Sequence, residues 1–159
     1  GVVVDRVVDL GQTVAASLFD WSPSDPFDAI LLDAPCSSTG TIRRHPDVAW
    51  TKTPIDIGKL ADLQFRMLAH AVSCVKPGGT ILFSNCSLLA EEGELLHARA
   101  VKEITALRPD PFHPAELPGL ETLIDGNGCL RSTPADMTLG DPSMSGMDGF
   151  FAARFIRSF

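Results

Sequence analysis

The stretch Phe27-Asp28-Ala29-Ile30-Leu31-Leu32 runs directly into Asp33-Ala34-Pro35-Cys36-Ser37-Ser38-Thr39-Gly40. A short apolar run bounded by Pro26 and by a Pro/Ser/Gly turn predicts a buried parallel strand with the turn at its carboxyl end. The sequence Thr80-Ile81-Leu82-Phe83-Ser84, followed by Asn85-Cys86, predicts a second buried strand that also ends at a cysteine. These two stretches decide the expected fold.

A helix is expected between the two strands, because residues 56–75 place apolar side chains at helical spacing. The apolar series comprises Ile57, Leu60, Leu63, Met67, Leu68, Ala71 and Val75. Thr53 as N-cap, Pro54 at the first helical position and Asp56 three residues after the cap predict its start. Lys76-Pro77-Gly78-Gly79 predicts its end. Strand, crossover helix and strand together imply the parallel pair from which doubly wound α/β sheets are built.

The rest of the chain continues the α/β pattern. A helix is expected over residues 90–107. Strands are expected over residues 13–18, with Asp20 near the carboxyl end, and over residues 128–133 and 149–157, the last antiparallel. A chain of 159 residues is long enough for one domain with a single core.

Composition excludes several classes of protein. A net charge of −7 and a pI of about 4.9 argue against a protein that holds nucleic acid through general basic charge. No apolar run approaches the roughly 20 residues of a membrane helix, and no secretion signal is present, so we expect a cytoplasmic protein without membrane contact. The four cysteines show no CxxC spacing and no companion His pair, so we expect free thiols and no metal site.

Two of the four cysteines follow the carboxyl ends of the expected strands. In open α/β sheets ligands bind outside these ends, which places Cys36 and Cys86 in one crevice. If the strands are neighbours, one planar substrate group can be reached from both sulfurs. Cys74 lies inside the amphipathic helix and is expected to be an inert packed thiol, while the sequence around Cys129 is uninformative.

Each motif also has a plainer interpretation. Residues 33–40 alone indicate a turn with Cys36 as a small apolar residue, and in Ser84-Asn85-Cys86-Ser87-Leu88-Leu89, Ser87 can be an N-cap and Cys86 a core filler. Two cysteines and Asp33 at functional strand ends favour shared thiol chemistry instead. A thiol redox protein is disfavoured because 50 residues separate Cys36 from Cys86 and no CxxC pair is present.

Four stretches of the chain are sequence motifs that occur in a characteristic order. They are residues 33–40, Arg43-Arg44-His45-Pro46-Asp47, Ser84 to Leu89 with Glu91-Glu92-Gly93-Glu94, and Gly146-Met147-Asp148-Gly149-Phe150-Phe151. In this order they closely resemble the Sun/Fmu family of RNA cytosine-5 methyltransferases, over most of the chain from about Asp20. The resemblance implies a Rossmann-like α/β fold that uses S-adenosylmethionine as the methyl donor.

The resemblance implies separate roles for two cysteines. Cys86 corresponds to the nucleophile, which adds to carbon 6 of a cytosine so that carbon 5 becomes electron-rich and attacks the methyl group. Cys36 corresponds to the second cysteine, which helps to break the covalent adduct by removing the carbon-5 proton. A free thiol has a pKa of about 8.5, and a position just before a helix N-terminus would favour the Cys86 thiolate.

The resemblance also implies contacts to donor and base. Asp33 corresponds to the acid that contacts both, and Asp20 to the acid that binds the adenosine part of the donor. Pro35 would line the cytosine pocket, with its backbone carbonyl at the exocyclic amine. The plainer alternatives are a turn cap for Asp33 and a solvated loop acid for Asp20.

A local basic segment interrupts the acidic chain. Residues 41–70 hold five Lys and Arg side chains against three Asp, so this segment carries +2 within a net charge of −7. The resemblance implies that Arg43 and Arg44 hold phosphates on either side of an extruded base. A solvated basic loop is the plainer interpretation.

The chain departs from the family pattern in two places. The only glycines in residues 1–19 are Gly1 and Gly11, so no Gly-rich donor loop precedes Asp20. Asn85 stands where relatives commonly have Thr. We expect residues 1–159 to be the C-terminal portion of an N-terminally truncated methyltransferase catalytic domain. The parent protein is expected to methylate carbon 5 of a cytosine in RNA, with ribosomal RNA as the substrate. The alternative is an inactive domain that binds RNA or a partner.

Overall fold

A computed structural model describes residues 19, 22–141 and 145–159 of the chain. The strand expected over residues 13–18 and the candidate Asp20 lie outside the described residues. The helices and strands are β1 (Phe27–Asp33), α2 (Val48–Thr51), α3 (Pro54–Cys74), β2 (Val75–Asn85), α4 (Glu94–Glu103), β3 (Leu107–Pro109), β4 (Leu130–Ser132) and β5 (Phe150–Arg157).

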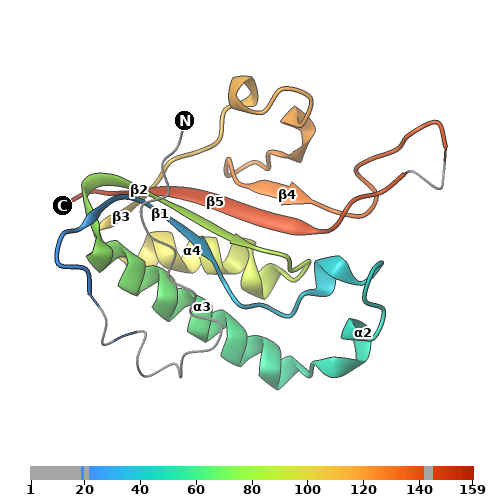
Figure 1. The fold of residues 1–159 in the computed structure, drawn as a ribbon, viewed down its shortest axis with the longest axis horizontal. Coiled ribbons are helices and arrows are strands. Elements are labelled where there is room, and N and C mark those ends of the chain that lie inside the picture. The colour runs from blue at the N-terminus through green and yellow to red at the C-terminus, as the bar shows by residue number, and fades with distance from the viewer. Residues whose placement is uncertain (1–18, 20–21, 142–144) are drawn as a thin grey trace.

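The strands form one mixed sheet in the order β1-β2-β5-β3, and β4 also pairs with β5 (Figure 1). β1 and β2 are parallel neighbours, and Asp33 pairs with Ser84, so both strands end at the same level. β5 runs antiparallel to β2, as its sequence predicted. The parallel pair and its crossover helix confirm the expected α/β unit.

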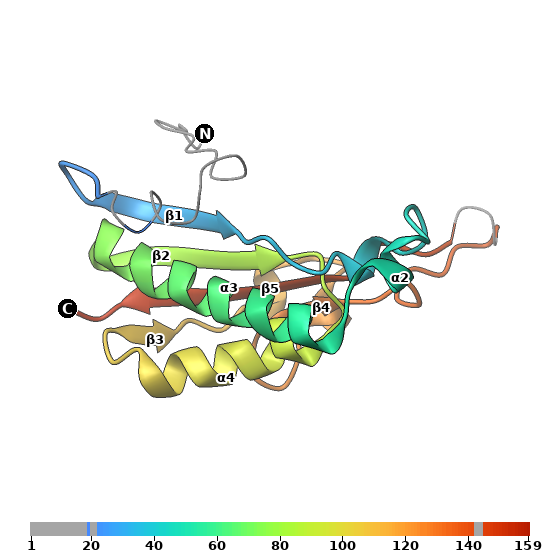
Figure 2. The ribbon, with the colours of Figure 1, turned by 90° about the horizontal axis from the view of Figure 1, so that it is seen from below.

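The crossover helix α3 begins as predicted. Thr53 and Asp56 form a reciprocal capping box, in which the Thr53 amide donates to Asp56 Oδ2 over 3.0 Å, and Pro54 occupies the first turn. α3 and α4 lie side by side on one face of the sheet, which Figure 2 shows from the helix side. Their apolar faces meet a core of aromatic and aliphatic strand residues, of which Phe83, Phe151 and Phe155 are fully buried.

The expectation that β1 is buried is wrong for the described chain. Leu31 is 69% exposed, and Leu32 is the only residue of the strand that is buried. The reason is the position of β1 at one end of the strand order, where α3 covers one of its two faces.

Two element boundaries also differ from the expected ones. Gly93 interrupts the helix expected over residues 90–107: a 3-10 helix (Ala90–Glu92) precedes α4, which ends at Glu103. Leu107 instead pairs with Arg157 as the first residue of β3, because pairing with the sheet overrides helix propensity. α3 ends at Cys74, just before the predicted stop signal, and β2 already begins at Val75, so residues 76–79 lie inside the strand, where the pairing with β1 is irregular.

None of the helices in the described residues is both long enough and apolar enough to cross a membrane. The two long helices α3 and α4 form one layer of the domain. The segment between β3 and β4 lies on the opposite side of the sheet (Figure 1). The loops that follow β1 and β2 both begin at the edge where these two parallel strands end. This edge positions the candidate site.

Candidate active site

Two thiols meet at the carboxyl ends of the parallel strands. The Sγ atoms of Cys36 and Cys86 lie 3.4 Å apart, and both residues are half-buried. All four cysteines are free thiols, as their spacing predicted. The expected proximity of Cys36 and Cys86 is confirmed, and it follows from the parallel pairing of the strands that precede them.

The loop after Cys36 bends sharply back over the Cys86 segment. Ser38 has a φ of 60°, the only positive φ at a non-glycine residue in the described chain. Gly40 donates its amide to the Cys86 carbonyl over 2.8 Å and accepts from the Gly149 amide over 2.8 Å. A Cβ at residue 40 would lie 2.6 Å from the Cys86 carbonyl oxygen, so this close approach requires glycine.

The two thiols have different electrostatic surroundings. Burial, together with the hydrogen bond and charge of Cys86, raises the pKa of Cys36 to about 11. Cys36 therefore keeps its proton at neutral pH. In the contact between the two sulfurs, either thiol can be the hydrogen-bond donor.

The positive charge near Cys86 comes from a side chain and not from a helix N-terminus. The expected helix does not begin directly after Cys86, because the 3-10 helix Ala90–Glu92 comes first and α4 starts at Glu94. The pKa of Arg44 is raised, chiefly by its hydrogen bond to Asp148 and to the smallest extent by its Coulombic interaction with Cys86.

Arg43 and Arg44 contact residues 145–148, at the start of the C-terminal motif. Arg44 Nε donates to Asp148 Oδ2 over 2.9 Å, and Arg43 Nη1 donates to the Ser145 carbonyl. Hydrogen bonding to Arg44 lowers the pKa of Asp148. The Arg44 side chain is 60% exposed, which agrees with a solvated basic loop. The hydrogen bonds of Arg43 and Arg44 nevertheless hold this loop to residues 145–148.

Asp33 and Pro35 lie beside the thiols at the end of β1. Asp33 is exposed, and its carboxylate accepts a weak hydrogen bond of 3.4 Å from Ser84 Oγ. The Pro35 carbonyl accepts from Gln64 Nε2 over 2.8 Å, which leaves its second lone pair for a further donor. The roles implied for Asp33, Pro35, Arg43 and Arg44 stay predictions, as does that of Asp20.

Sequence reasoning missed the buried polar residues that join the two cysteine loops. Glu92 and Gln64 are both 0% exposed, and Gln64 Nε2 donates to Glu92 Oε1 over 2.8 Å. The pattern of α3 contained a signal, since Gln64 falls on its apolar face and a buried amide needs polar partners. Glu92 belongs to the motif Glu91-Glu92-Gly93-Glu94, but its burial follows from tertiary packing alone.

Asn85, the departure from the family pattern, has a defined place in this loop. It is 0% exposed, donates to the Glu92 carbonyl over 2.7 Å and accepts from the Ser87 amide over 3.0 Å. Ser87 does not cap a helix; its hydroxyl donates to Glu92. Asn85 thus fixes the backbone on either side of Cys86.

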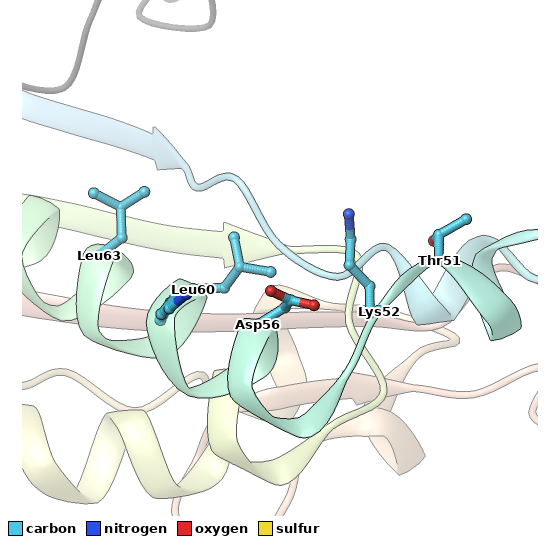
Figure 3. A pocket seen from close by; sticks show the side chains of 6 residues that line it. Thr51, Lys52, Asp56, Leu60 and Leu63 are labelled. Atoms are coloured by element: carbon cyan, nitrogen blue, oxygen red, sulfur yellow. The ribbon is translucent and has the colours of Figure 1, made fainter.

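A hollow of about 420 Å³ borders α3 but does not hold the thiols (Figure 3). Its lining residues are Thr51, Lys52, Asp56, Lys59, Leu60 and Leu63. Within residues 19, 22–141 and 145–159, no group of three or more His, Cys, Asp or Glu side chains is arranged to hold a metal ion.

The fold and the thiol pair define the class of this protein: an α/β domain of the Rossmann-like methyltransferase type. Comparison with known families is more specific. The chain belongs to the family described as 16S rRNA methyltransferase RsmB/F, whose sequence profile matches residues 8–156.

Curated relatives agree with this assignment. The chain is 37% identical over 144 residues to ribosomal RNA small subunit methyltransferase B of Shewanella oneidensis, covering 91% of this chain and 30% of that protein. It is 39% identical over 137 residues to the protein of the same name from Cronobacter sakazakii, covering 86% and 28%. The chain thus spans about 30% of the length of these relatives.

Solved structures share the fold. The methyltransferase homolog protein from Pyrococcus horikoshii matches with a TM-score of 0.59 and 29% identity, over 84% of this chain and 40% of that one. NSun6 from the same organism, solved with SFG, matches with a TM-score of 0.66 over 93% of this chain and 34% of its own, at 23% identity. The second match speaks for the fold alone.

Proposed function

We propose that the parent protein methylates carbon 5 of a cytosine in ribosomal RNA, in the cytoplasm and without a metal ion, through a covalent adduct to Cys86. The observation that carries this proposal is the contact of 3.4 Å between two thiols at the edge of the sheet where β1 and β2 end. The family assignment supports the substrate class. S-adenosylmethionine, when bound, supplies the methyl group.

In the proposed reaction the Cys86 sulfur donates an electron pair to carbon 6 of the cytosine, and the 5,6 double bond becomes an electron pair available at carbon 5. Carbon 5 would use that pair to take the methyl group, while the bond from the methyl group to the donor's sulfur breaks and leaves its electron pair on that sulfur. Asp33, at the end of β1, faces the same edge and is proposed to hold both donor and base, with Asp20 at the adenosine. A hydrogen-bonded carboxyl at the ring would help it to accept electrons.

Cys36 is proposed to complete the reaction. Part of the rise in its pKa comes from the hydrogen bond and the charge of Cys86, and both disappear once Cys86 is a neutral thioether. Cys36 then loses its proton to water more readily and removes the proton from carbon 5. The electrons of that C–H bond re-form the 5,6 double bond, and the bond from carbon 6 to Cys86 breaks to release the thiolate.

Substrate binding is proposed for the exposed side of the same edge. Arg43 and Arg44 would bind phosphates flanking the extruded base, and Arg44 would do so in exchange for part of its contact with Asp148. The free lone pair of the Pro35 carbonyl would accept from the exocyclic amine of the cytosine.

Residues 1–159, which span about 30% of the length of the curated relatives, are proposed to form the C-terminal portion of the parent's catalytic domain. The remainder would then supply the donor loop. Titration calorimetry of the chain alone should show weak S-adenosylmethionine binding or none. Micromolar binding would mean that the donor site lies within these residues.

The function is tested by incubating the full-length parent with small-subunit ribosomal RNA and labelled S-adenosylmethionine, then digesting the RNA to nucleosides. Mass spectrometry should detect labelled 5-methylcytidine. Labelled methyl groups on another base or another ring position would contradict the cytosine-5 assignment, and an unlabelled RNA would favour the alternative of a binding domain.

A further inference from the structure

A buried carboxylate connects the two cysteine loops. Each cysteine is followed by a serine, and both serine hydroxyls donate to the same oxygen of Glu92: Ser37 Oγ over 2.5 Å and Ser87 Oγ over 2.6 Å. The two hydroxyl oxygens lie 3.1 Å apart. All three residues are 1% exposed or less.

The second oxygen of Glu92 receives two more donors. The Ser37 amide donates to Glu92 Oε1 over 2.9 Å, and Gln64 Nε2 donates to the same oxygen over 2.8 Å. Gln64 also donates to the Pro35 carbonyl, so it reaches Glu92 and the residue before Cys36 at once. Its own Oε1 is buried and has no hydrogen-bond partner among the described residues.

These contacts are a poor arrangement for stability alone. A buried carboxylate loses its hydration, and among the residues that the structure describes no Lys or Arg lies within ion-pair distance of Glu92. Burying the Gln64 carbonyl oxygen without a partner adds a further penalty. Such a network restricts the geometry of the loops that it joins.

We propose that Glu92 is a positioning residue that sets the spacing and relative orientation of Cys36 and Cys86. Its carboxylate ties together the residues that directly follow the two cysteines, and so it holds the two sulfurs at the observed 3.4 Å. The catalytic meaning of this spacing rests on the proposed function, in which the sulfurs act on adjacent carbons of one ring. The spacing itself does not depend on that function.

The test measures how easily the two thiols form a disulfide, which reports their geometry without RNA or donor. In glutathione buffers, glutathione disulfide is reduced to two glutathiones as Cys36 and Cys86 are oxidised to one disulfide. The full-length parent is acid-quenched and alkylated, and mass spectrometry of its peptides gives the oxidised fraction. A matched control is available in Glu91, an exposed glutamate of the same 3-10 helix.

Glu92→Gln should lower the equilibrium constant for this disulfide by at least about 10-fold, because looser loops reduce the effective concentration of one thiol at the other. Glu91→Gln should leave it within about 2-fold of wild type. An unchanged or increased constant in Glu92→Gln would overturn the proposal. Circular dichroism and thermal melting check that each variant is folded.

Ser37→Ala and Ser87→Ala provide a second test that does not require Glu92→Gln to fold. Each leaves the carboxylate with its other donors and should lower the constant about 3-fold or more. In the Glu92→Gln background the serine substitutions should have little further effect, because the three residues act as one unit. Serine variants that match Glu91→Gln would contradict the proposal. A parent that lacks methyltransferase activity but gives the expected redox shifts would refute only the proposed function.

Discussion

Two pairs of cysteines occupy different regions of the molecule. Cys36 and Cys86 are half-buried at the carboxyl ends of β1 and β2 with their sulfurs 3.4 Å apart. Cys74 and Cys129 are each 2% exposed, Cys74 at the end of α3 and Cys129 before β4. The residue type is the same, so the difference in expected chemistry comes from placement: one pair faces a ligand edge and the other fills the interior.

The largest effect is expected from Cys86→Ala in the parent protein. Without the sulfur that adds to carbon 6, methyl transfer should fall by a factor on the order of 10⁴ or more. Labelled 5-methylcytidine in RNA digests measures it. Cys74→Ala, the matched substitution in the other pair, should keep near wild-type activity where it is folded, and an equal loss in both variants would remove the distinction between the pairs.

Reaction with iodoacetamide should be slow at Cys36 at pH 8, because the reagent attacks thiolates and the pKa of this thiol is raised to about 11. The rate of labelling at Cys36 should increase with pH toward that value. In Cys86→Ala the pKa of Cys36 should fall, so its labelling at a fixed pH should become faster; peptide mass spectrometry over time measures these rates.

Cys129→Ala should affect stability and not chemistry. Removing a buried sulfur from the core should lower the free energy of unfolding by about 1–2 kcal/mol, as read from urea unfolding. Methyl transfer per folded molecule should be unchanged. If Cys129→Ala lost methyl transfer while its free energy of unfolding was unchanged, Cys129 would have a role in the chemistry, as proposed for Cys36 and Cys86.

The smallest effect is the pH dependence of that stability difference. Burial, together with the charge of Asp125, raises the pKa of Cys129 to about 12 from an ordinary value of 9.0. The neutral thiol therefore stabilises the fold fully below about pH 9, and this contribution is lost as the pH rises toward 12, because the unfolded chain ionises first. The difference in unfolding free energy between wild type and Cys129→Ala should thus narrow between pH 8 and pH 10.

Local sequence was sufficient for the scaffold of the site. The capping box at Thr53 and the apolar face of α3 predicted the helix, and the apolar runs before Asp33 and Asn85 predicted the parallel strands. Because the carboxyl ends of parallel neighbours coincide, the proximity of the two thiols could be predicted as well. These features depend on patterns within 20 residues or on one topological rule.

Features that depend on distant contacts could not be predicted. Leu107 leaves the expected helix because it pairs with Arg157 in β5, and Leu31 is exposed because β1 lies at the end of the strand order. Glu92 looks like a solvated acid beside Glu91, and its burial against Ser37 depends on loops that are 55 residues apart. Nothing local distinguishes the two glutamates.

The central claim is that Cys36 and Cys86 act as a pair with unequal roles, and Cys36→Ala in the full-length parent tests it most directly. The variant is incubated with ribosomal RNA and S-adenosylmethionine and run on a denaturing gel, with the Cys36→Ala, Cys86→Ala double variant as control. The account predicts a protein–RNA adduct that accumulates with Cys36→Ala and is absent from the double variant. An adduct that persists without Cys86, or none with Cys36→Ala while Cys86→Ala still methylates, would contradict it.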